Sequence, residues 1–265
     1  MTIAAAYLTS EGVVLGTDST TTVSTQQGVA QLLDYAQKIF EVGENSRFGI
    51  CTWGAGKIGD VSHRSLIARL ADKSALDKTK VCDAANTFVQ IVAKEYGDGS
   101  NTGKVGYLLG GYDADTHVPE CYECVFDGSN PVNVVPLKIG EARFFGCPEF
   151  FMRVFYGYDN RLPGKIFEDL KKQQCLVPGK NVDVAFKTAF ANAAAPLAAA
   201  GFGDLPIREA VDYVHTYLHI TIKAFKFRFG PPICGGPIEI AFITSDRKFR
   251  WALHKDFTRA IYEQE

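Results

Sequence analysis

The amino-acid sequence predicts an α+β fold in which two stacked sheets lie between two layers of helices, a four-layer αββα sandwich. Three observations support this prediction. Strand-like segments occupy both ends of the chain, helix-like segments form two blocks between them, and no internal repeat or low-complexity linker interrupts the order. A chain of 265 residues is long enough for one large core. We therefore expect a single domain over residues 1–265.

The predicted strands are short apolar or β-branched runs bounded by Gly, Pro, Asp or Asn. Residues 2–8 and 12–18 form such a pair and predict a hairpin that places the start of the chain in a sheet. Pro237–Thr244 and Lys248–His254 predict a second hairpin, and its alternating pattern indicates one buried face. Further strands are predicted at Phe48–Cys51, Val105–Gly111, Cys121–Phe126, Val132–Leu137 and Ala142–Phe145.

Helices are predicted where apolar residues recur three and four positions apart. The first block contains two such segments, and the second block, from Pro148 to about Phe225, contains three or four. The clearest segments are Val61–Asp72, Lys80–Tyr96, Lys165–Gln174, an Ala-rich stretch at Val182–Ala200, and Ile207–Phe225.

Composition excludes several classes of protein. The net charge of −2 gives no basic footprint for nucleic acid. The seven cysteines are scattered and odd in number, which is not the pattern of a secreted disulfide framework. No apolar run reaches the roughly 18 residues of a membrane span. The first residues lack the basic start and the apolar core of a signal peptide. We expect a cytoplasmic protein with neither nucleic acid nor membrane as a partner.

Thr2 is the first residue that suggests chemistry. Initiator methionine is commonly removed before a residue this small, and Thr2 directly follows Met1. A freed Thr2 would carry a hydroxyl and an α-amine on one residue. Because an α-amine has a pKa near 8, it can act as the base for its own hydroxyl. Thr2 is therefore a candidate nucleophile.

Three further residues could complete such a site. Lys38 precedes an apolar segment, and its buried ammonium would stabilise a deprotonated Thr2 hydroxyl. Asp18 ends the second predicted strand, and its carboxylate would hold the lysine in position. Gly54 follows a predicted strand, so its backbone N–H could stabilise an oxyanion. Taken singly, each residue is ordinary as a turn former, a surface charge or a backbone break; the combination predicts the site.

The chain resembles a proteasome β-type subunit, a family of N-terminal nucleophile hydrolases, over most of its length. The resemblance rests on the interval from Thr2 to Asp18, which equals that of the family, and on several motifs. These motifs are Gly12-Val13-Val14-Leu15-Gly16-Thr17-Asp18-Ser19, Gln37-Lys38-Ile39-Phe40, Trp53-Gly54-Ala55-Gly56 with Asp60, Tyr107-Leu108-Leu109-Gly110-Gly111-Tyr112-Asp113 with Glu120-Cys121-Tyr122, and Gly235-Gly236-Pro237-Ile238-Glu239-Ile240.

The resemblance implies a threonine peptidase with Thr2 as nucleophile, Asp18 and Lys38 as the activating pair and Gly54 as oxyanion donor. It also implies peptide or unfolded-protein substrates, a homo-oligomeric ring and an unknown unfoldase partner. Two sets of residues would bind substrate. Thr22 and Gly56 would hold an extended peptide by strand addition, and Thr21, Ala36, Phe40 and Thr52 would line the first specificity pocket.

The sequence departs from the family pattern in three places. Gly146-Cys147-Pro148 stands where the family has a serine after the glycine. The segment 229–234 offers neither the Asp nor the Ser that orient the terminal amine in the family. A helical insertion of about 45 residues, at about 159–203, is the third difference.

The other motifs of the sequence give weaker evidence for a binding site. His215 and His219 lie four apart on a predicted helix, but no Glu or third ligand accompanies them, which favours a structural role over zinc. Cys121 and Cys124 lack a second cysteine pair, and the paired glycines lack the pattern of a phosphate-binding loop. We therefore expect no metal and no cofactor.

Two hypotheses from different classes remain open. The chain is either an active threonine peptidase of a homo-oligomeric ring, or a non-catalytic structural subunit of such a ring. Retention of Met1 and the altered amine-orienting positions would favour the second hypothesis. A related alternative is an amidase with the same catalytic residues that acts on small amides.

Overall fold

The computed structural model describes most of the chain, in ten segments. They are residues 2–25, 28–73, 78–97, 103–128, 132–155, 157–159, 161–173, 182–195, 203–229 and 233–255. The chain divides into two compact units, a larger one formed by Met1–Gly146 with Gly203–Glu265, and a smaller one formed by Cys147–Phe202.

The first sheet of the larger unit joins the two ends of the chain. Its strand order is β10-β1-β2-β11-β12, and every neighbouring pair is antiparallel. The pairing of β1 with β2 and of β11 with β12 confirms both predicted hairpins. The strands are β1 (Ala4–Leu8), β2 (Gly12–Thr17), β10 (Glu141–Phe145), β11 (Glu239–Thr244) and β12 (Lys248–Leu253).

The second sheet has the order β5-β6-β7-β8-β9 and is also antiparallel. Its strands are β5 (Ile39–Glu41), β6 (Phe48–Gly54), β7 (Val105–Tyr112), β8 (Pro119–Phe126) and β9 (Val134–Pro136). A separate ribbon pairs β3 (Thr21–Thr25) with β4 (Gly28–Leu33). The sequence did not predict β3, β4 or β5. β5 is only three residues long, and the β3–β4 segment is rich in Thr and Gln and lacks a clear apolar alternation.

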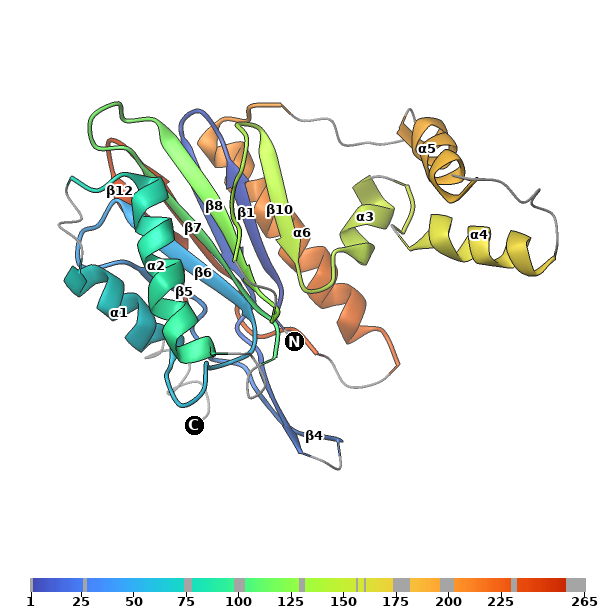
Figure 1. Cartoon of the computed structure of the whole chain (residues 1–265), viewed down its shortest axis with the longest axis horizontal. Coiled ribbons are helices and arrows are strands. Elements are labelled where there is room, and N and C mark those ends of the chain that lie inside the picture. Colours follow the sequence, from blue (N-terminus) through green and yellow to red (C-terminus); the bar gives the residue numbers. More distant parts are fainter. Residues whose placement is uncertain are drawn as a thin grey trace. The chain divides into compact units, whose positions relative to one another are not determined.

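Two apolar clusters hold the larger unit together, and Figure 1 shows the sheets and helices that contribute to them. One cluster lies between the sheets and combines residues such as Leu15 and Ile243 of the first sheet with Leu108 of the second. The other lies between the second sheet and the helices α1 (His63–Lys73) and α2 (Val81–Tyr96), where Phe88 packs against Tyr107. Helix α6 (Ile207–Lys226) contacts β1, β2 and β11 of the first sheet.

The smaller unit contains the helices α3 (Glu149–Phe155), α4 (Leu162–Lys172) and α5 (Val182–Ala194). Neither α4 nor α5 has a fully buried residue, and ring contacts such as Phe167 with Phe186 connect them. Hydrogen bonds from Arg161 and Arg153 hold the pKa of Asp159 well below its usual range. This unit begins at Cys147, so it contains α3 as well as the helices of the segment at about 159–203.

Helix α6 is the longest helix in the described part of the chain, and its buried residues, such as Val214 and Leu218, recur at helical spacing among charged and polar ones. Across those residues, no helix combines the length and the apolar character that a membrane crossing requires.

Candidate active site

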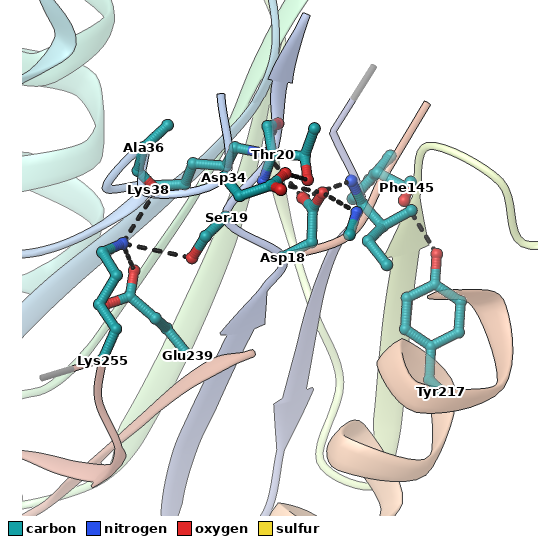
Figure 2. A network of polar contacts seen from close by, with 12 residues as sticks. Asp18, Ser19, Thr20, Asp34, Ala36, Lys38, Phe145, Tyr217, Glu239 and Lys255 are labelled. Carbon is teal, nitrogen blue, oxygen red and sulfur yellow. Dashed lines mark hydrogen bonds and ion pairs between the residues drawn. The ribbon is translucent and has the colours of Figure 1, made fainter. Parts of the chain in front are cut away.

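Asp18 and Lys38 form a buried ion pair at the ends of strands from different sheets. Asp18 directly follows β2 of the first sheet, and Lys38 directly precedes β5 of the second. Lys38 Nζ lies 2.7 Å from Asp18 Oδ1, and the two side chains are 5% and 0% exposed. Figure 2 shows this pair within a larger network of polar contacts. The structure therefore brings together two residues that are 20 positions apart in the sequence.

The Asp18 carboxylate also organises the backbone around it. Its Oδ1 accepts a hydrogen bond from the N–H of Ile3 at 3.1 Å, in addition to the one from Lys38. Its Oδ2 accepts bonds from the N–H groups of Thr20 at 3.3 Å and Gly235 at 3.1 Å. Because Ile3 directly follows Thr2, a single carboxylate oxygen connects Lys38 with the residue next to the predicted nucleophile.

The Lys38 ammonium has a second acceptor, the carbonyl oxygen of Thr20 at 2.6 Å. An ammonium has three N–H donors. The third donor has no acceptor among the described residues. Burial lowers the pKa of Lys38, and the neighbouring Asp18 carboxylate opposes that shift. Burial likewise raises the pKa of Asp18, opposed by the Lys38 ammonium and the backbone N–H groups.

Thr2 lies just before β1 and is 8% exposed. The chain after β10 passes very close to it at Gly146, where φ is +95° and an added Cβ would lie 2.2 Å from the Thr2 carbonyl oxygen. Only glycine fits there, because both the space and the backbone conformation exclude a side chain. Met1 lies outside the described residues, so its predicted removal is not tested.

Gly54 is the last residue of β6 and is exposed. Its φ is +94°, and an added Cβ would lie 2.2 Å from the carbonyl oxygen of Lys104. The following residue, Ala55, donates its N–H to the same carbonyl at 3.1 Å. His63 holds the other side of Ala55, with Nε2 2.8 Å from the Ala55 carbonyl oxygen and Nδ1 2.9 Å from the Tyr107 hydroxyl. The turn that carries Gly54 is thus fixed by contacts on both sides.

The predicted substrate-binding residues fall in different environments. Thr21 and Thr22 begin β3 and are partly exposed, as is Ala36, and Gly56 is exposed in the turn after β6. Thr52 is buried and donates its hydroxyl to the carbonyl oxygen of Gly106 at 3.2 Å. Phe40 is only 6% exposed and belongs to the apolar cluster under α1 and α2.

Several residues of this network had no signal in the sequence. Thr20 and Gly235 bind Asp18 through their backbones, which any residue could do. A second buried ion pair joins Lys255 Nζ and Glu239 Oε2 at 2.6 Å, and Lys255 follows the last strand. A lysine and a glutamate near the end of a chain are normally surface residues, so only the structure reveals this pair.

The other candidate sites remain without a ligand set. His215 and His219 face each other on α6 with ring centroids 5.7 Å apart, and no group of three potential metal-binding side chains occurs among the residues that the structure describes. Cys121 and Cys124 are buried, and burial raises the pKa of Cys124 to about 12. Cys175 lies outside the described residues.

Comparison with known proteins identifies a shared fold. No family model matches the chain, and no curated protein does. Among solved structures, the chain is similar to the Gly-1 mutant of Anbu from Hyphomicrobium sp. strain MC1. The TM-score is 0.58 at 12% sequence identity, and the match covers 100% of this chain and 93% of the other. Anbu is a proteasome-like protein, so the chain has a fold of the proteasome-like type.

Proposed function

We propose that the chain is a subunit of a proteasome-like threonine peptidase that hydrolyses peptide bonds with Thr2 as nucleophile after removal of Met1. The observation that carries this proposal is the double contact of Asp18 Oδ1, with Lys38 Nζ at 2.7 Å and with the N–H of Ile3 at 3.1 Å. We also infer a four-layer αββα sandwich of the N-terminal nucleophile hydrolase type, on the basis of the fold shared with Anbu.

In the proposed reaction, the free α-amine of Thr2 takes the hydroxyl proton as Thr2 Oγ attacks the peptide carbonyl carbon. The Gly54 N–H stabilises the resulting oxyanion. The peptide C–N bond then breaks, the amine gives its proton to the leaving nitrogen, and an ester on Thr2 Oγ remains. Water, activated by the same amine, hydrolyses that ester and restores Thr2.

Lys38 would stabilise the negative charge that develops on Thr2 Oγ. Its remaining N–H donor is the one available for this contact, because the other two bind Asp18 and Thr20. These steps use only side chains and backbone groups of the chain, so the proposed reaction needs no metal or cofactor.

The proposal extends to assembly and location. We propose a homo-oligomeric ring in the cytoplasm that cleaves peptides or unfolded proteins, with the unfoldase partner unknown. Thr22 and Gly56 would hold an extended substrate strand, and Thr21, Ala36 and Thr52 would line the pocket beside it. Phe40 belongs to the same proposed pocket, and its side chain also packs in the apolar cluster under α1 and α2.

A non-catalytic ring subunit is the second candidate. The sequence favours it in one respect, because Gly146-Cys147-Pro148 and the segment 229–234 lack the residues that orient the terminal amine in proteasome subunits. Residues 230–232 lie outside the described part of the chain. In this reading Met1 would remain in place.

Intact mass and a covalent threonine-directed probe separate the two candidates. A peptidase requires loss of Met1 and labelling of Thr2. The Thr2→Ala variant should lose labelling while it stays folded, with its free energy of unfolding lowered by at most about 3 kcal/mol. Thr2→Ser is the matched control, since it keeps a hydroxyl and should still react. Undiminished labelling of Thr2→Ala would exclude Thr2 as the nucleophile, and a retained Met1 would favour the non-catalytic subunit.

A further inference from the structure

A second buried cation lies beside the Asp18–Lys38 pair. The side chain of Lys255 is 1% exposed and its ammonium is 2.6 Å from the carboxylate of Glu239, which is 0% exposed. Removing two charges from water costs more free energy than a simple ion pair returns, unless further hydrogen bonds satisfy the groups. The further contacts of Lys255 therefore indicate what this ion pair is for.

Those contacts lead to the two segments that carry the candidate site. Lys255 Nζ donates to Ser19 Oγ at 3.2 Å and to the carbonyl oxygen of Ala36 at 3.0 Å. Ser19 directly follows Asp18, and Ala36 is two residues before Lys38. Figure 2 shows the Lys255 ammonium reaching both residues and Glu239 at once. The Lys255 ammonium, which follows the last strand, thus binds the segment that carries Asp18 and the segment that carries Lys38.

The backbone reinforces the same connection. The Ala36 N–H donates to the Ser19 carbonyl oxygen at 2.9 Å, and the Ser19 N–H donates to the Gly235 carbonyl oxygen at 3.0 Å. Gly235 in turn donates its own N–H to Asp18. A shift of Ser19 or Ala36 would therefore move the Asp18 carboxylate and the Lys38 ammonium relative to each other.

We propose that Lys255, held by Glu239, is a positioning residue that fixes the geometry and the charge of the Asp18–Lys38 pair. This inference rests on the proposed function only for its effect on Thr2. The titratable groups that act on Lys38 are Asp18, the Cys234 thiol and Lys255 itself. Burial is the main cause of the lowered pKa of Lys38, and the Lys255 charge acts in the same direction. The other carboxylate oxygen of Glu239, Oε1, lies 2.7 Å from His254 Nδ1.

A purely structural ion pair would behave differently. Its removal would lower the free energy of unfolding but would leave the titration of Lys38 and the reactivity of a folded Thr2 unchanged. A positioning role predicts that both the titration of Lys38 and the reactivity of Thr2 change. Lys255→Met deprives the buried Glu239 carboxylate of its ammonium partner, so this variant can fail to fold. The Glu239→Gln/Lys255→Met double variant removes both charges and is the main test.

The experiment follows Lys38 by isotope-labelled lysine side-chain NMR over about pH 6 to 11, with Lys38→Met to assign its signal. In the double variant we expect the Lys38 midpoint to change, because the Lys255 charge that acts on Lys38 is gone and the segments at Ser19 and Ala36 lose their hydrogen bonds to it. We expect labelling of Thr2 by the covalent probe to slow by about 10- to 100-fold. The single variant Lys255→Arg keeps the positive charge beside Glu239, so its Lys38 midpoint should equal that of the wild type. Lys187→Met, which breaks the exposed pair with Asp183, is the matched control and should change neither readout.

The outcomes separate the two proposals. If wild-type Thr2 is not labelled, the proposed peptidase fails, while the Lys38 midpoint still tests the role of Lys255. If wild-type Thr2 is labelled and the folded double variant keeps both the labelling rate and the Lys38 midpoint, the positioning role is overturned and the peptidase stands.

Discussion

Replacing Asp18 by Asn tests how strongly one carboxylate holds the candidate site together. The carboxylate accepts four hydrogen bonds, two on each oxygen. An amide has one acceptor oxygen, so two donors lose their partner whichever way it turns. Hydrogen bonds to a charged group contribute about 1.5–3 kcal/mol each. Lys38 also loses its counter-charge while its side chain is only 5% exposed. We therefore expect a loss of about 3–5 kcal/mol in the free energy of unfolding.

A double-mutant cycle measured by urea unfolding at a fixed protein concentration provides the assay. Lys38→Met should cost less than Asp18→Asn, because Asp18 keeps its three backbone N–H donors. The Asp18→Asn/Lys38→Met double variant no longer buries an unpaired ammonium, so the two losses should overlap by about 1–3 kcal/mol. A loss below about 1 kcal/mol for Asp18→Asn, or strict additivity of the two changes, would refute the reasoning.

Two further predictions concern residues around the site. Burial lowers the pKa of His63, so the unfolded chain binds the proton first; stability should be constant above about pH 6.5 and fall as the pH drops below it. Urea midpoints from pH 8 to 5 should show a shallower slope for His63→Gln, and equal slopes would contradict this role. Gly146→Ala should destabilise the fold by about 1–3 kcal/mol and slow probe labelling of Thr2, because an added Cβ would meet the Thr2 carbonyl oxygen. In thermal unfolding, Gly103→Ala is the matched control, since nothing lies within 4 Å of its added Cβ, and an equal effect of both changes would refute the steric argument.

Periodicity predicted the elements of the fold best where burial is one-sided. The terminal hairpins and the helices α1, α2 and α6 lie where the apolar pattern places them. The β3–β4 ribbon was not predicted, since β3 mixes Thr and Ser with a single Val and neither strand shows a clear apolar alternation. The sequence predicted an insertion at about 159–203, and the structure groups α3 with the helices of that segment in one compact unit.

For the candidate site, the sequence by itself determined which residue types are available. Asp18 at the end of a clearly patterned strand, Lys38 before an apolar segment and the resemblance to proteasome β-type subunits were sufficient to propose the pair. Only the tertiary structure decided which groups support that pair. Gly235 reaches Asp18 across 217 positions and Lys255 reaches Ser19 across 236, because the last hairpin of the chain adds to the sheet that the first hairpin begins. Contacts over such distances depend on how the strands pair in three dimensions, and a glycine N–H or a terminal lysine gives no sign of them in the sequence.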